Sequence, residues 1–177
     1  MNENLVSVTG STLLIIDDRP HNLLFLSTLL IKQGYKLRKA LTGAAAIKTV
    51  QTKLPDLILL KMHLRGMSGY EVCAALVANP ATCSIPIIFM DVPTQFDDVV
   101  KIFAVGAADY ITEPIKVEEV LVRVNYQLTI KKLQTQLAKK NAKLRQEILG
   151  RKRAEYALKK LNKSLSRSSA ILQRGQV

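Results

Sequence analysis

This chain has few of the residue types that usually identify a function from composition alone. It contains two cysteines, two histidines and no tryptophan in 177 residues. Cys73 and Cys83 are too few for a disulfide framework and do not form a metal-type cluster, and His21 and His63 have no third histidine to join them. Neither a phosphate-binding glycine loop nor a dinucleotide-binding glycine fingerprint is present. The composition therefore points away from disulfide-rich, metal-binding and common nucleotide-binding proteins.

Long hydrophobic runs are also missing. No apolar stretch reaches about 18 residues, so we expect no transmembrane helix. The first dozen residues have neither a basic region nor a long apolar run, so we expect no signal peptide. Hydrophobic residues nevertheless make up 48% of the chain, enough to bury the core of one domain of ordinary size. The simplest expectation is a soluble cytoplasmic protein.

The net charge of +12 is distributed very unevenly. Residues 1–130 contain 12 basic and 12 acidic residues, whereas residues 131–177 contain 14 basic and only two acidic ones. The whole excess of +12 therefore lies in the tail. Such a segment favours a polyanion, an anionic membrane surface or an acidic protein partner.

Short apolar runs alternate with helical periods along the first part of the chain. The predicted strands cover residues 12–16, 35–40, 56–60, 85–90 and 108–111. The predicted helices run from Pro20 to about Gly34, over 43–52, 68–78 and 96–105, and from Val117 onward. Ser68 and Glu71 have the spacing of a capping box. Five such units predict an α/β fold with a doubly wound, five-stranded parallel sheet, whose functional groups lie at the carboxyl ends of the strands.

The last helix has a seven-residue repeat, which is typical of a coiled coil. The main row consists of Ile130, Leu137, Leu144, Arg151, Leu158, Leu165 and Leu172, and Leu133, Ala154 and Leu161 fill part of a second row. A helix over this segment would be about 65 Å long at about 1.5 Å per residue. We expect a parallel homodimer, and the alternative is a solvated single helix. The predicted organisation is a 1–10 tail, an 11–128 domain, a 129–172 basic coiled-coil helix and a 173–177 tail.

Several landmarks in the predicted domain occur in the order of a known family. They are Asp17 and Asp18 after the first strand, the strand and glycine loop of 55–69, Tyr110 in the fifth strand, and Pro114. Over residues 11–128 the chain resembles the receiver domain of response regulators, with a flavodoxin-like fold, and particularly the receivers of cyanobacterial hybrid kinases. The resemblance implies that the acidic pair would hold Mg²⁺ and that Tyr110 is the aromatic switch residue.

Three positions depart from the family pattern and predict a degenerate phosphorylation pocket made of Asp17, Asp18, Lys61, Asp91 and Glu113. Lys61 replaces the phosphorylated aspartate, Asp91 replaces a Thr or Ser, and Glu113 replaces a lysine. We expect the Lys61 ammonium to sit where Mg²⁺ would bind and to pair with Glu113, so that Mg²⁺ binds weakly or not at all. Neutral drift is the alternative explanation, and Asp18 has the alternative role of capping the helix that Pro20 begins.

The sequence thus favours a pseudo-receiver without catalytic residues, which serves as a phosphorylation-independent interaction and dimerisation module in two-component signalling. Its expected partner, at the surface of about residues 95–128, is a signalling protein such as a histidine kinase or an output protein. One alternative is an authentic phosphorelay receiver with a displaced acceptor, Asp18 or Asp91. Another is a nucleic-acid binder that uses the basic helix, although Tyr156 is its only aromatic residue for base stacking.

Overall fold

A computed structural model describes the backbone of residues 8–92, 96–112 and 114–174, and the side chains of residues 8–90, 97–112 and 114–163. The chain divides into two compact units between Leu133 and Gln134. The first unit contains the sheet and its helices. The second is a continuation of the last helix.

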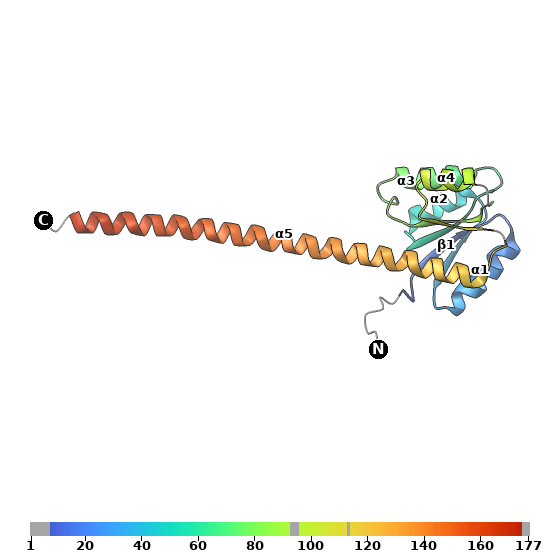
Figure 1. Ribbon diagram of the computed structural model, residues 1–177, viewed down its shortest axis with the longest axis horizontal. Coiled ribbons are helices and arrows are strands. Elements are labelled where there is room, and N and C mark those ends of the chain that lie inside the picture. Colours follow the sequence, from blue (N-terminus) through green and yellow to red (C-terminus); the bar gives the residue numbers. More distant parts are fainter. Residues whose placement is uncertain (1–7, 93–95, 113, 175–177) are drawn as a thin grey trace. The chain divides into compact units, whose positions relative to one another are not determined.

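The first unit is built on a five-stranded parallel sheet (Figure 1). Its strands are β1 (Thr12–Ile16), β2 (Lys36–Ala40), β3 (Leu57–Lys61), β4 (Ile87–Val92) and β5 (Asp109–Thr112). Their spatial order is β2-β1-β3-β4-β5, so the chain winds outward in both directions from β1. This arrangement confirms the doubly wound sheet predicted from the sequence. All five carboxyl ends meet at one edge because the strands are parallel.

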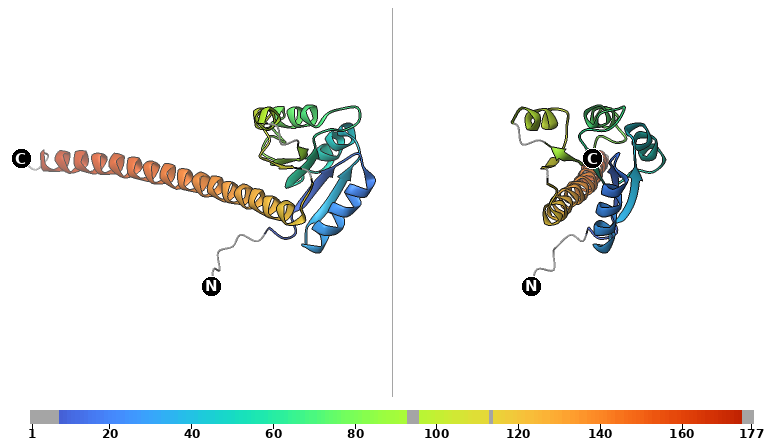
Figure 2. Two further views of the ribbon diagram at one scale, coloured as in Figure 1. Left: turned by 45° about the vertical axis from the view of Figure 1, so that its right-hand side comes forward. Right: turned by 90° about the vertical axis from the view of Figure 1, so that its right-hand side faces the viewer.

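Helices cover both faces of this sheet, as Figure 2 shows. They are α1 (Pro20–Lys32), α2 (Gly43–Thr52), α3 (Gly69–Ala78), α4 (Phe96–Ala104) and the first part of α5 (Val117–Arg174). Leu14 and Ile16 of β1 pack with α2, α3 and α4, whereas Leu13 and Ile15 pack with α1 and α5. Burial on both faces explains why the central strands β1 and β3 are almost entirely apolar, whereas the edge strand β2 is partly exposed and contains three basic residues.

Local signals in the sequence set where these helices begin and end. Pro20 opens α1, and Gly34 adopts a φ of 83° just after its end, a conformation that favours glycine. Ser68 and Glu71 form the predicted capping box at the start of α3. Cys73 on the same helix is fully buried, and burial raises the pKa of its thiol to about 11, so it is a core residue.

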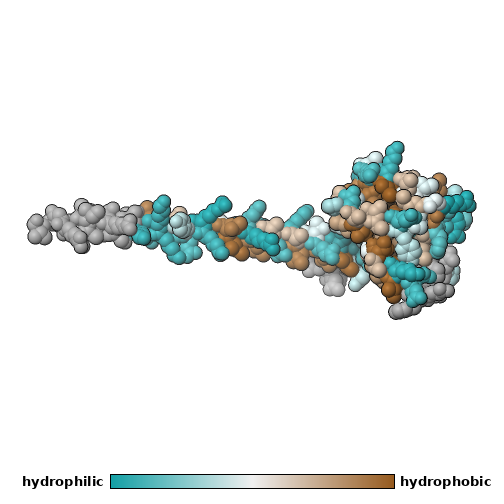
Figure 3. Space-filling view, turned by 90° about the horizontal axis from the view of Figure 1, so that it is seen from above, coloured by the Kyte–Doolittle hydropathy of each residue, from teal (hydrophilic) through white to brown (hydrophobic). Residues whose placement is uncertain are grey.

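The second unit consists of the remainder of α5. Every described side chain from residue 134 to residue 163 is exposed, including the large apolar residues of the heptad rows. Figure 3 shows hydrophobic side chains interspersed with hydrophilic ones along this segment. A helix that buries nothing gains little tertiary stabilisation. Within the part of the chain that the structure describes, no helix has a stretch long and apolar enough to cross a membrane.

Candidate functional site

Lys61 and the acidic pair meet at the carboxyl edge of two neighbouring strands. β1 ends at Ile16 and β3 ends at Lys61, and the register of the two strands pairs Ile16 with Leu60. The residues that follow β1 therefore lie at the level of Lys61. The Lys61 Nζ atom donates a hydrogen bond of 2.6 Å to Asp18 Oδ1 and lies 3.6 Å from Asp17 Oδ1. One ammonium thus contacts both carboxylates.

Asp17 is held in place by hydrogen bonds from residues that directly follow it in the chain. Its Oδ1 accepts a 2.8 Å hydrogen bond from the Arg19 backbone N–H, and its Oδ2 accepts one of 3.0 Å from the Asn22 side-chain amide. Arg19, not Asp18, is the N-cap residue of α1. The alternative role of Asp18 as the helix cap is therefore wrong, because Asp18 is directed to Lys61 while Asp17 satisfies the backbone N–H of Arg19.

The cluster is shielded from solvent, which strengthens its internal electrostatics. The exposed fraction of the side chain is 9% for Lys61, 1% for Asp17 and 13% for Asp18. The hydrogen bond from Lys61 lowers the pKa of Asp18 despite the opposing effect of burial. Arg65 Nε also lies 3.6 Å from Asp18 Oδ2, but the Arg65 side chain is 94% exposed and adds little.

Of the two other unusual positions, only Asp91 has a described backbone. Asp91 belongs to β4, one residue beyond Met90, which pairs with Lys61 in the sheet register. The side chain of Asp91 and the whole of Glu113 lie outside the described residues. The predicted pair of Lys61 with Glu113 stays a prediction for that reason.

The described side chains do not fit the Mg²⁺ site of a receiver. Mg²⁺ requires oxygen ligands at about 2.0–2.1 Å in octahedral geometry. Here an ammonium occupies the end of β3 and contacts both Asp17 and Asp18. No group of three or more His, Cys, Asp or Glu residues is placed to hold a metal among the residues that the structure describes.

Tyr110, the predicted switch aromatic, belongs to a cluster that the sequence analysis missed. Its ring packs edge-on against Phe103 of α4, with centroids 5.9 Å apart, and the Arg123 guanidinium lies 5.7 Å from its centroid. Arg123 also donates hydrogen bonds to Asp109 (2.7 Å) and Glu119 (2.9 Å). These bonds outweigh the effect of burial and raise the pKa of Arg123. The four-residue spacing of Glu119 and Arg123 was the available signal.

The predicted coiled-coil seam lies on both sides of the boundary between the two units. Ile130 is half-buried and Leu133 is exposed in the first unit. The exposed members of the second unit are Leu137, Leu144, Leu158 and Leu161, and the side chain of Leu165 lies outside the described residues. No described residue of the chain covers these leucines, so a seam exists only if another molecule supplies its other half.

The chain is similar to known signalling proteins. The family model of the response regulator receiver domain matches residues 13–125. A protein named probable cyclic di-GMP phosphodiesterase, from Vibrio cholerae, is 35% identical over 148 residues, which cover 84% of this chain and 33% of that protein. The DNA-binding dual master transcriptional regulator RpaA of Synechocystis is 36% identical over 112 residues, covering 63% of this chain and 46% of the regulator. The chain thus spans less than half the length of either relative.

A solved structure agrees with this similarity. The signal receiver domain of a signal transduction histidine kinase from Syntrophus aciditrophicus superimposes with a TM-score of 0.64 at 29% identity, covering 68% of this chain and 91% of that one. The matched segment of the phosphodiesterase is longer than the receiver domain alone. It covers 148 residues of this chain, so even a match that began at residue 1 would end beyond residue 128. The similarity therefore includes part of the helix that follows the sheet.

Proposed function

Because this chain belongs to the response regulator receiver family, we propose that it acts in two-component signalling as a pseudo-receiver that works without phosphorylation. The observation that carries the proposal is the 2.6 Å hydrogen bond between Lys61 Nζ and Asp18 Oδ1. A receiver needs a carboxylate at the end of β3 to form an acyl phosphate, and a lysine amine does not become an acyl phosphate there. The family role that remains for this domain is binding, not phosphoryl transfer.

Lys61 also replaces the second requirement of the chemistry, which is a divalent cation. Its ammonium is covalently attached to the end of β3 and neutralises charge on Asp17 and Asp18. We expect this arrangement to hold the site in one geometry, although a buried ion pair does not by itself guarantee extra stability. Mg²⁺ binding should be weak or absent, because the ion would have to displace a cation that cannot diffuse away.

The proposed activity is protein interaction and dimerisation. The surface around residues 95–128, which includes Tyr110 and Arg123, is the proposed contact for a signalling protein such as a histidine kinase or an output protein. The C-terminal helix is proposed to pair with the same helix of a second copy, and its positive charge offers a contact for a polyanion. The extended match to the phosphodiesterase supports a role of this helix next to a receiver. The cyanobacterial hybrid-kinase type stays a proposal that rests on the sequence pattern alone.

Phosphorylation with a small donor tests the proposal. The full chain, its Lys61→Asp variant and an ordinary receiver as the positive control are incubated with acetyl phosphate and Mg²⁺, and phosphate is measured by intact mass and hydroxylamine sensitivity. We expect none on the unmodified chain. Lys61→Asp alone should also stay unmodified, because Asp91 and Glu113 would repel the phosphate.

A triple variant makes the same experiment sharper. Lys61→Asp combined with Asp91→Thr and Glu113→Lys restores the three residue types of the family and should become phosphorylated. A hydroxylamine-sensitive phosphate on the unmodified chain would instead support the displaced-acceptor alternative. Phosphorylation of the single variant would mean that Asp91 and Glu113 matter less than we propose.

A further inference from the structure

The charges of residues 1–130 are divided between two halves. Residues 19–55, which include α1, β2 and α2, contain seven basic residues and no acidic one. The rest of this part of the chain contains five basic and 12 acidic residues. The neutral receiver therefore combines a half with an excess of +7 and a half with an excess of −7. A surface with such a positive excess attracts a partner of negative charge.

Four of the basic residues meet where the edge strand β2 lies beside α2. Lys36 and Arg38 are two residues apart on β2 and so point to the same face of the sheet. Arg38 donates hydrogen bonds to the backbone carbonyl of Lys53 and, at 2.7 Å, to the hydroxyl of Thr52 at the end of α2. Lys48 precedes Thr52 by about one helical turn and therefore lies on the same side of α2. We call Lys36, Arg38, Lys48 and Lys53 the β2–α2 cluster.

The β2–α2 cluster is accessible, and the chain itself does not neutralise it. Its three lysines are exposed, and its arginine is half-buried. No ion pair joins any of the four residues to a carboxylate within the part of the chain that the structure describes. Several carboxylates of the acidic half, in contrast, are paired with the lysine of the pocket or with the arginine of α5. The positive excess is therefore available to another molecule.

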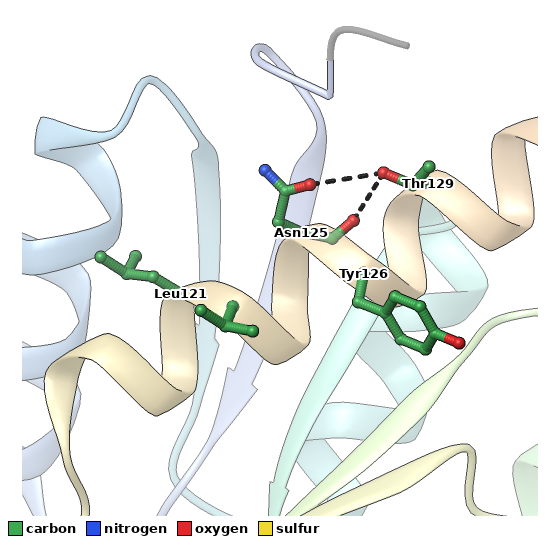
Figure 4. A pocket seen from close by; sticks show the side chains of 5 residues that line it. Leu121, Asn125, Tyr126 and Thr129 are labelled. Atoms are coloured by element: carbon green, nitrogen blue, oxygen red, sulfur yellow. Dashed lines mark hydrogen bonds between the residues drawn. The ribbon is translucent and has the colours of Figure 1, made fainter. Parts of the chain in front are cut away.

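The outer side of α5 offers a different kind of surface, which Figure 4 shows. A hollow of about 510 Å³ is lined there by Leu121, Val122, Asn125, Tyr126 and Thr129. None of these five side chains is charged, and the Thr129 hydroxyl donates to the backbone carbonyl of Asn125 at 2.8 Å. An anion would lose hydration in this hollow without gaining a cation. The hollow therefore does not compete with the β2–α2 cluster for an anionic partner.

The surroundings of the β2–α2 cluster favour the phosphates of a duplex over other anionic groups. The exposed side chains of α2 are Ala44, Ala45, Lys48, Gln51 and Thr52. They include no large apolar residue to insert into a lipid interface, and the exposed Leu54 beyond the helix is a small anchor on its own. Neither β2 nor α2 contains an aromatic residue on which the bases of a single strand would stack. Duplex DNA presents one phosphate charge per about 1.7 Å of its axis, which matches cations spread over a strand and a helix.

We infer that the receiver itself binds the phosphate backbone of duplex nucleic acid through the β2–α2 cluster, without reading its sequence. Arg38 is held against the end of α2 by two neutral acceptors, so its charge is not cancelled. The three lysines supply ammonium groups that bind phosphates as point charges. The cluster is separate from the Lys61 pocket and from the tail, so the inference depends neither on the pseudo-receiver role nor on the dimer.

Binding of the full chain to a fluorescent DNA duplex at several salt concentrations tests this inference. Lys36→Gln, Lys48→Gln and Lys53→Gln are combined in one cluster variant, and Arg38 is kept because it holds the end of α2. Each lost phosphate contact should make the slope of log K against log salt shallower by about 0.9, so the variant should lose about 2.7 of the slope. Between about 50 and 200 mM salt, the unmodified chain should therefore lose about 40-fold more affinity than the variant.

A matched control removes three positive charges elsewhere in the receiver. It combines Arg65→Gln, Lys101→Gln and Lys116→Gln, which are all exposed. Since the two variants have the same net charge, the control should keep the slope of the unmodified chain. An equal change in both variants would mean that only net charge matters, and an unchanged cluster variant would mean that the tail alone binds. Either result would overturn the inference, and circular dichroism checks that both variants are folded.

A lipid surface is distinguished from nucleic acid in the same set of variants. Binding is measured to phosphatidylcholine vesicles with and without phosphatidylserine at the same salt concentrations. We expect the cluster substitutions to weaken binding to the duplex more than binding to the anionic vesicles. A larger loss on the anionic vesicles would assign the β2–α2 cluster to a membrane surface and overturn the inference.

Discussion

The two parts of this chain follow opposite rules. Up to residue 130, acidic and basic residues balance, and apolar residues fill two cores on either side of a sheet. From residue 131 onward, the excess charge is +12, and from 134 to 163 no described side chain is buried. The first part is ordered by its own interior. The second part has the pattern of a helix that needs another molecule to cover its leucines.

The two parts also differ in how their apolar residues are buried. Leu14 and Leu60 are fully buried, whereas Leu137 and Leu144 are 60% and 54% exposed. Burying a leucine completely contributes roughly 1.5–3 kcal/mol. Leucines that repeat every seven residues along the tail and stay exposed would therefore contribute a large free energy if a second molecule buried them. The same residue type therefore stabilises the fold in the receiver and, in the proposed dimer, would stabilise association of the tail.

The largest expected effect comes from breaking the tail. Leu137→Lys combined with Leu144→Lys places two charges in the predicted seam and should convert the proposed dimer into a monomer whose receiver stays folded. Light scattering gives the mass, and circular dichroism the folded state. The control replaces two exposed apolar residues of α1, Leu24→Lys and Ile31→Lys, and should leave the dimer intact.

Salt provides a further check on this first prediction. Two tails bring together about +24, so added salt should screen the repulsion and tighten the dimer. A full chain that stays monomeric at high salt would mean that the tail is a solvated basic helix, and a polyanion would become its best candidate partner.

The second largest effect is expected when the charge cluster of the receiver is disrupted instead of the tail. Lys61→Ala leaves Asp17 and Asp18 without their cation in a shielded site, which should cost about 3–5 kcal/mol of unfolding free energy. Mg²⁺ should then bind the freed carboxylates and restore part of this loss. Urea denaturation with and without Mg²⁺ measures both effects, and Lys48→Ala on the exposed surface of α2 is the control. An equally strong Mg²⁺ response of the unmodified protein would contradict the proposal.

Much of the receiver could be predicted because its sequence signals are local. Short apolar runs predicted β1, β3 and β4, and Pro20, Gly34 and Ser68 predicted where helices begin or end. The contact of Lys61 with the acidic pair was also predictable, because adjacent parallel strands end at the same edge.

The pairing partners of individual charged side chains could not be predicted, because neighbouring side chains compete for the same partner. Asp17 and Asp18 are chemically equivalent in the sequence, and only the fold decides that Asp17 accepts the Arg19 N–H while Asp18 accepts the Lys61 ammonium. Arg123 is a similar case, since its partner Asp109 lies 14 residues away on a strand. Such pairings depend on side-chain directions, which periodicity does not specify.

A smaller change in stability is expected when one glycine in each part is replaced by alanine. Gly69 lies against the sheet, and an added Cβ would be 2.5 Å from the Lys61 carbonyl oxygen, whereas a Cβ at Gly150 of α5 would meet nothing within 4 Å. We expect Gly69→Ala to destabilise the receiver by about 1–3 kcal/mol through overpacking. Gly150→Ala should stabilise the tail helix by about 1 kcal/mol. Thermal melts and the helical signal measure these changes, and the same sign for both would contradict the contrast.

The smallest effect concerns pH. The pKa of Asp18 is lowered from its ordinary value of 3.8, chiefly by the hydrogen bond from Lys61. A carboxyl whose pKa is lower in the folded state stabilises the fold above its unfolded pKa, and this contribution is lost as the pH falls through the folded pKa. The stability advantage of the unmodified chain over Asp18→Asn should therefore be constant near neutral pH and shrink below about pH 4. Glu147→Gln serves as the control, because the Glu147 side chain is exposed, and urea midpoints between neutral pH and the acid limit measure the difference. A gap between the unmodified chain and Asp18→Asn that stays the same down to the acid limit would mean that the contact with Lys61 does not stabilise the fold through charge.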